Sequence, residues 1–175
     1  MINVFTIRFF LELGLFFLIS GKIGISQNVL AYDVSGIPDS VGKNAYAVIR
    51  KKIVQCRILN EKQFRVSEKR VITVLNKAGE NNAALVIFYD KFRHIDAVKG
   101  NIYNGTGKLF RKLTTKDFSD VAAVSEYSLY DDNRICYFQP LISEYPYTVE
   151  YEYQVTFESL YYLSQWFAFP GYNMG

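Results

Sequence analysis

Three residues carry the side chains from which a nucleophilic mechanism could be assembled: Cys56, Cys136 and the single histidine, His94. A catalytic thiol needs a base beside it, so one of the cysteines would have to meet His94 in space. Neither cysteine has a histidine near it in sequence, and nothing marks either thiol as activated. The sequence therefore predicts no catalytic residue in this chain and a structural role for His94.

The cysteines and the acidic residues are also potential metal ligands, and the two cysteines are a potential disulfide pair. Cys56 and Cys136 lie far apart without a C-x-x-C motif, and residues 131–132 lack calcium-loop spacing. Residues 104–107 lack the Lys-Ser/Thr of a phosphate loop. From these patterns together we expect neither a metal nor a cofactor. Two interpretations of the cysteines remain open: a disulfide formed in an oxidising compartment, or two separate buried thiols.

The composition favours β-structure over helix. The 175 residues include 14 Tyr and 14 Phe, and 50% are hydrophobic. Aromatic side chains suit the pleated, half-buried surface of a sheet. The formal net charge of +3 is far below the clustered positive charge that nucleic-acid binding requires, so nucleic acid is excluded as a leading partner.

Residues 1–26 have the pattern of an export signal. Arg8 precedes the apolar stretch 9–19, and small residues lead to a cleavage site after Ser26. Glu12 interrupts the apolar stretch, which argues against an uncleaved membrane anchor. We expect an exported protein of the periplasm or cell envelope.

A polar entry segment, residues 27–44, comes next, and its Pro38 and Gly36 argue against a regular element there. Residues 45–175 then read as one all-β domain. Apolar and polar residues interleave in strand-like runs at 47–59, 63–75, 83–89, 95–103, 108–113, 127–130, 134–138 and 147–157. This pattern predicts an antiparallel β-sandwich of roughly seven to nine strands built from hairpins.

Turn residues predict three hairpins. Their turns are residues 76–79, with Gly79 in the left-handed conformation, residues 104–107 and residues 131–133. Each turn is expected to join the two strands that flank it. A β-bulge is expected near residues 51–52, and Thr114 is expected to cap a short helical turn.

The strictest alternation lies at residues 147–157, where every aromatic falls on one face of a strand. The tail at 160–169 is also aromatic and fits either a helical turn or another strand. Core packing explains most of the aromatics, but Tyr161, Tyr162 and Trp166 are candidates for a ligand-facing surface that stacks on a glycan or a peptide.

Six short motifs, in order along the chain, resemble the bacterial domain of unknown function 3857: residues 75–80, 89–92, 98–108, 117–120, 127–134 and 145–153. The resemblance runs from about Ala45 to the C-terminus. It implies a non-catalytic antiparallel β-sandwich beside a transglutaminase-like domain with a Cys-His-Asp site in exported proteins. It also implies that the domain is incomplete at its C-terminus, because similar sequences continue past residues 169–171.

Two functional hypotheses follow, and a third is weaker. The first is a non-enzymatic module of an exported protein that packs against a transglutaminase-like domain or presents substrate to it. The alternative is a stand-alone carbohydrate- or peptide-binding or adhesion sandwich. The third, an enzyme within these residues, depends on Cys56 or Cys136 meeting His94. The sequence does not predict an oligomeric state.

Overall fold

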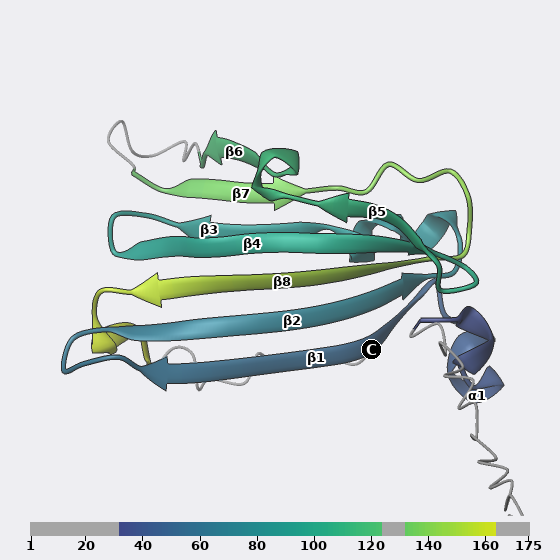
Figure 1. Ribbon diagram of the computed structural model, residues 1–175, viewed down its shortest axis with the longest axis horizontal. Coiled ribbons are helices and arrows are strands. Elements are labelled where there is room, and N and C mark those ends of the chain that lie inside the picture. The colour runs from purple at the N-terminus through teal and green to yellow at the C-terminus, as the bar shows by residue number, and fades with distance from the viewer. Residues whose placement is uncertain (1–31, 124–131, 164–175) are drawn as a thin grey trace, which may run out of the picture.

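The computed structural model describes residues 32–123 and 132–163 (Figure 1). Within these ranges, no helix is long and apolar enough to cross a membrane. The predicted export signal at 1–26, the predicted strand at 127–130 and Trp166 lie outside the described residues.

Two antiparallel sheets form the domain. The larger has the strand order β1-β2-β8-β4-β5 and the smaller the order β3-β7-β6. Figure 1 shows β8 lying between β2 and β4. The strands are β1 (Ala47–Ile58), β2 (Phe64–Val74), β3 (Leu85–Tyr89), β4 (Arg93–Asn104), β5 (Leu109–Leu113), β6 (Ser119–Ala122), β7 (Arg134–Phe138) and β8 (Tyr147–Phe157). The predicted all-β class is confirmed, and the arrangement is consistent with a β-sandwich.

The remaining elements are single turns of helix or short 3-10 segments. They are η1 (Val34–Gly36), α1 (Asp39–Gly42), η2 (Lys77–Ala83), η3 (Thr115–Asp117) and η4 (Leu160–Tyr162). The prediction that no regular element forms in the entry segment is therefore wrong. Pro38 and Gly36 do not prevent helical turns there, because Pro38 directly precedes α1, where a missing backbone donor costs nothing.

The core lies between the sheets, and β8 contributes more buried side chains to it than any other strand. Tyr147, Val149, Tyr151 and Val155 alternate along one face of β8 and are buried, as the period-two pattern predicts. The Tyr151 hydroxyl donates a 2.7 Å hydrogen bond to the carbonyl of Ala83, at the end of η2. This contact ties the central strand of the larger sheet to the segment that leads into the smaller one.

Three local predictions are confirmed. Residues 104–107 join β4 to β5 in a hairpin, and Gly107 has a φ of 78°, which favours glycine. The register between β1 and β2 shifts between Ile49 and Lys51, as expected for a bulge. Thr114 precedes η3, where Thr114 and Asp117 form a capping box.

The predicted hairpin through residues 76–79 is wrong. Strand β2 pairs with β1 and β8, whereas β3 pairs with β7 in the other sheet. The intervening η2 crosses between the sheets, and the Asn76 side chain accepts from the Ala78 amide at its start. Gly79 serves close packing rather than a left-handed turn, because a Cβ atom there would lie 2.1 Å from the Tyr46 carbonyl oxygen.

One further pairing was not predicted, and one predicted pairing lies outside the described residues. A loop at residues 59–63 joins β1 to β2 in a hairpin, and the turn residues did not predict it. The predicted partner of β7, residues 127–130, lies outside the described residues. Within them β7 is flanked by β3 and by the short strand β6, which the sequence pattern missed.

Candidate functional site

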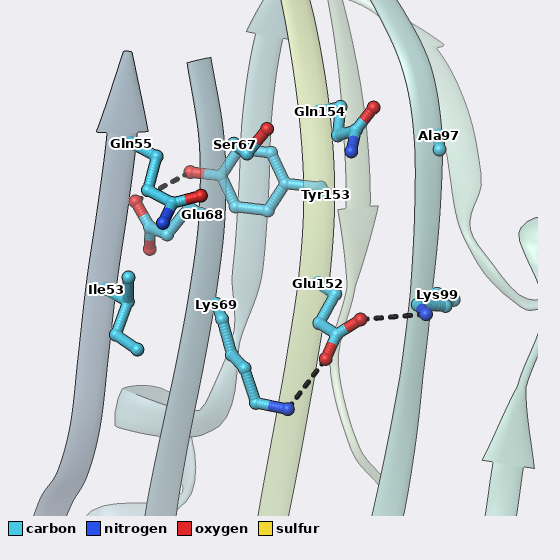
Figure 2. A pocket seen from close by; sticks show the side chains of 10 residues that line it. All are labelled: Ile53, Gln55, Ser67, Glu68, Lys69, Ala97, Lys99, Glu152, Tyr153 and Gln154. Atoms are coloured by element: carbon cyan, nitrogen blue, oxygen red, sulfur yellow. Dashed lines mark hydrogen bonds and ion pairs between the residues drawn. The ribbon is translucent and has the colours of Figure 1, made fainter. Parts of the chain in front are cut away.

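A shallow groove crosses the larger sheet on the face turned away from the core, and we call it the transverse groove (Figure 2). Its volume is about 450 Å³. A second hollow of about 510 Å³ adjoins it and shares three of its residues, Gln55, Ser67 and Gln154. The transverse groove is lined by Ile53, Gln55, Ser67, Glu68, Lys69, Ala97, Lys99, Glu152, Tyr153 and Gln154.

The floor of the groove is a row of side chains that face each other across four strands. Gln55 of β1 pairs with Ser67 of β2, Ser67 pairs with Gln154 of β8, and Gln154 pairs with Ala97 of β4. Residues opposite each other in antiparallel strands project on the same side of the sheet. Ser67 and Ala97 are short and Gln55 and Gln154 are long, so the floor of this trench across the strands is lowest at β2 and β4.

One wall of the groove is an ion-pair ladder centred on Glu152. The Lys69 and Lys99 ammonium groups each lie 2.7 Å from a different carboxylate oxygen of Glu152, as Figure 2 shows. Lys69 also lies 2.9 Å from Glu150. Hydrogen bonds from Lys69 and Lys99 lower the pKa of Glu152 to about 2, so the ladder is charged at neutral pH.

The opposite wall is a second polar cluster. On β2 it starts at Arg65, four residues before Lys69 of the first wall. The Arg65 guanidinium lies 3.0 Å from Asp96 and donates a 3.1 Å hydrogen bond to the Thr156 hydroxyl. Thr156 in turn donates to Asp96 at 2.6 Å. His94 pairs with Thr156 in the register and is about half exposed. The two walls therefore place basic side chains on both sides of the trench.

At the far end of the same face, the entry segment is held against the sheet. The Tyr32 hydroxyl donates to Glu150, and the Tyr32 ring meets the Tyr103 ring edge-on at 4.9 Å. Burial, followed by the hydrogen bond to Glu150, raises the pKa of Tyr32. Glu150 is itself buried, which is allowed because Tyr32 and Lys69 both satisfy its carboxylate.

The structure does not bring His94 together with either cysteine. Cys56 shares the core-facing row of Val66 and Val155, whereas His94 lies in the outward row of Thr156. Three strand spacings, roughly 14 Å, also separate their strands. Cys136 lies in the other sheet and faces the core. Both cysteines are free thiols, and burial raises the pKa of each.

The aromatic residues that were candidates for ligand contact follow β8. Tyr161 is 73% exposed, and its ring meets the ring of Tyr162 edge-on. Tyr162 in turn packs against Phe157, at the end of the larger sheet. Trp166 lies outside the described residues. Across residues 32–123 and 132–163, no cluster of three His, Cys, Asp or Glu side chains could hold a metal ion.

The smaller sheet exposes a contiguous group of hydrophobic side chains on its outer face, which we call the apolar patch. Register places Val86 beside Tyr137, and Phe88 beside Ile135 and then Val121. Phe88 is 57% exposed and Val86 is 48% exposed. The residues that alternate with them, among them Leu85, Ile87 and Cys136, face the core. Both faces of this sheet are therefore apolar, although only one is covered by the described residues.

A third hollow, of about 650 Å³, lies between the β4–β5 turn and residues 141–147. Phe110 and Leu141 line it and are well exposed. Tyr147 also lines it, and the buried hydroxyl of Tyr147 has no hydrogen-bond partner among the described residues. The sequence placed Tyr147 on the aromatic face of a strand, but it did not point to Phe110 or Leu141.

The two sheets, with a polar groove on the outer surface of one and an apolar patch on the outer surface of the other, are consistent with a β-sandwich. The chain belongs to the family described as Domain of Unknown Function with solved-structure structure (DUF3857), whose model matches residues 62–172. The predicted resemblance is confirmed, although the match begins after β1 rather than near Ala45.

A solved chain from Parabacteroides distasonis, described as a putative protease, has a similar fold. The two share 13% sequence identity with a TM-score of 0.53. The match covers 65% of the present chain but only 23% of the solved one. In the Parabacteroides chain, the matching domain is thus a minor part of the total length. No curated protein sequence matches this chain.

Proposed function

We propose that this chain is a non-catalytic β-sandwich module of an exported protein, and that its apolar patch packs against an adjoining transglutaminase-like domain. The observation that carries the proposal is the exposed apolar patch. In addition, the solved chain with a similar fold is much longer, since the match covers only 23% of it. Contiguous exposed hydrophobic side chains usually mark an interaction surface.

The size of the apolar patch supports a partner in the same polypeptide. Five side chains offer far less area than the roughly 1,200–2,000 Å² buried in stable complexes between separate proteins. Interfaces between domains of one chain are smaller, from about 600 Å². A covalent tether raises the effective concentration of the partner, so a small interface is enough.

The arrangement of the candidate nucleophiles supports the non-catalytic assignment. Cys56 and His94 project from opposite faces of the larger sheet, and Cys136 faces the core. A thiol without a base within hydrogen-bond reach is a poor nucleophile at neutral pH. Any Cys-His-Asp chemistry would belong to the adjoining domain, and the signal-like residues 1–26 support export of the whole protein.

The reading frame downstream of Gly175 tests the proposal directly. We expect it to continue into a segment that contains Cys, His and Asp in the order of a transglutaminase-like site. A stop codon immediately after Gly175 would contradict a tethered partner. A continuing frame that encodes an unrelated domain would contradict the transglutaminase-like assignment and leave packing by the apolar patch to be measured separately.

A further inference from the structure

We propose that the transverse groove binds an extended, acidic peptide segment that lies across the strands of the larger sheet. The inference rests on the groove alone and does not depend on the function proposed for the apolar patch, which lies on the other sheet. Its elements are the low floor, the hydrogen-bonding groups on that floor and the basic side chains on both walls.

The dimensions of the groove fit one extended chain. The floor runs from Gln55 on β1 to Ala97 on β4, which is three strand spacings, roughly 14 Å. An extended peptide rises about 3.3 Å per residue, so this length holds about four residues. The walls start from residues four apart on one strand, Arg65 and Lys69, or roughly 13 Å. Their long side chains narrow this space, which leaves no room for a helix about 10 Å across.

The floor offers hydrogen-bonding groups that the protein itself does not use. Among the residues that the structure describes, no hydrogen bond engages the side chains of Gln55, Ser67 or Gln154. Each glutamine amide has both donors and acceptors, and can therefore pair with the N–H and C=O groups of a peptide backbone. These three side chains follow one another across β1, β2 and β8, so together they span about three residues of an extended peptide.

The walls give the groove a preference for negative charge. The basic side chains of Arg57, Arg65, Lys69 and Lys99 surround it, and so do four carboxylates, those of Glu68, Asp96, Glu150 and Glu152. The Glu68 side chain is only 12% exposed and accepts a hydrogen bond from Tyr153, so it presents little charge to the trench. Glu150 is buried and turned toward Tyr32, so it presents little charge to the trench. Within the described part of the chain, Arg57 makes no ion pair, and it is exposed. Arg57 is therefore the most available cation for a ligand carboxylate.

The same surface favours a peptide over a glycan. Sugar rings bind most often by stacking on an aromatic face. Among the described residues, Tyr153 is the one aromatic residue that lines the groove; it is in contact with the core, and its hydroxyl donates to Glu68 at 2.9 Å. Without an aromatic platform, recognition must come from hydrogen bonds and charge, which match an acidic polypeptide.

Binding can be measured by fluorescence anisotropy with a fluorescein-labelled decapeptide of alternating Glu and Ser. A decapeptide of alternating Lys and Ser has the opposite charge, and polygalacturonate, added as an unlabelled competitor, represents acidic glycans. We expect the Glu peptide to bind and the Lys peptide not to bind. Affinity should fall as salt is added, because exposed charges are screened.

Two variants localise the binding to the groove. Arg57→Glu removes the free cation, and its matched control Lys108→Glu makes the same change of charge in the exposed β4–β5 turn. Ala97→Tyr raises the floor, and its control Ala122→Tyr adds the same ring at an exposed position of β6. We expect each groove variant to bind the Glu peptide about tenfold more weakly: Arg57→Glu because a charge-assisted contact is lost, and Ala97→Tyr because the ring occupies the floor. Each control should bind normally.

Several results would overturn the inference. Failure of the Glu peptide to bind is one such result. Equal weakening of binding by Lys108→Glu and Arg57→Glu is another, because it would indicate only general attraction to a basic protein. Polygalacturonate displacing the peptide at equal charge would favour a glycan ligand instead. Circular dichroism on each variant confirms that it is folded. All four positions are exposed, so a loss of binding in Arg57→Glu and Ala97→Tyr alone reports on the groove.

Discussion

The Tyr32 hydroxyl donates a 2.5 Å hydrogen bond to Oε2 of Glu150, although the two residues are 118 positions apart in the chain. Glu150 belongs to the central strand β8, and Tyr32 belongs to the entry segment. The contact therefore fastens the start of the domain to the middle of its larger sheet. It also satisfies a carboxylate that would be costly to bury without a partner.

Removal of this hydroxyl should destabilise the fold. We expect Tyr32→Phe to lower the free energy of unfolding by about 1–2 kcal/mol, because the charged Glu150 carboxylate loses the hydrogen bond that Tyr32 donates to it. Urea denaturation monitored by circular dichroism measures the change. Tyr46→Phe is the control, since Tyr46 is largely exposed and should give no measurable change. Equal stability of Tyr32→Phe and the unmodified chain would show that the entry segment does not support the sheet.

A pair of core tyrosines makes a sharper comparison. Tyr151→Phe removes the hydrogen bond to the Ala83 carbonyl and leaves that acceptor unpaired, at a cost of about 1–3 kcal/mol. Tyr147 is equally buried, but its hydroxyl has no partner among the described residues. Tyr147→Phe should therefore be neutral or stabilising. Chemical denaturation of both variants tests this, and a Tyr147→Phe variant that is the less stable of the two would refute it.

The ladder at Glu152 predicts how stability depends on pH. The folded-state pKa of Glu152 is about 2, below the ordinary value of 4.5, so its contribution is present above pH 4.5. That contribution is lost as the pH falls from about 4.5 toward 2. Thermal melts at pH 7 and pH 3 should show a smaller drop in Tm for Glu152→Gln than for the unmodified chain. Identical drops would mean that the ladder is not formed in solution.

Strand positions could be predicted from the sequence because they depend on local alternation. The strand at 147–157 and the turn at 104–107 needed no information from elsewhere in the chain. The partner of β2 could not be predicted in this way. Residues 76–79 have the composition of a tight turn, but Gly79 is required by the close approach of Tyr46, which becomes visible only when β1 is in place.

The transverse groove was inaccessible to sequence reasoning for a related reason. Ser67, Ala97 and Gln154 are unremarkable on their own strands and form a trench only when the register aligns them. The apolar patch carried a weak signal, since the run at 83–89 is apolar at consecutive positions rather than at alternate ones. A strand that is apolar on both faces predicts burial on both faces. The signal was missed because that run was assigned to a simple hairpin.

The cysteines should behave as structural thiols. We expect neither Cys56 nor Cys136 to react rapidly with iodoacetamide near neutral pH, because burial raises both pKa values. His94→Ala should leave both rates unchanged. Mass spectrometry of timed samples measures the rates, and the urea-unfolded chain provides the fast reference. A rapidly alkylated cysteine that slows in His94→Ala would revive the catalytic hypothesis.

Protection of the apolar patch by the rest of the protein is the most direct test of the proposed function. The measurement is the alkylation rate of a cysteine placed by Phe88→Cys, compared between residues 1–175 and the product of the full reading frame. We predict rapid labelling in the shorter chain and labelling at least about tenfold slower in the longer protein, because a packed interface excludes the reagent. Lys108→Cys, in the exposed β4–β5 turn, should label equally in both. Equal rates for Phe88→Cys in the two proteins would contradict the packing of the apolar patch against an adjoining domain.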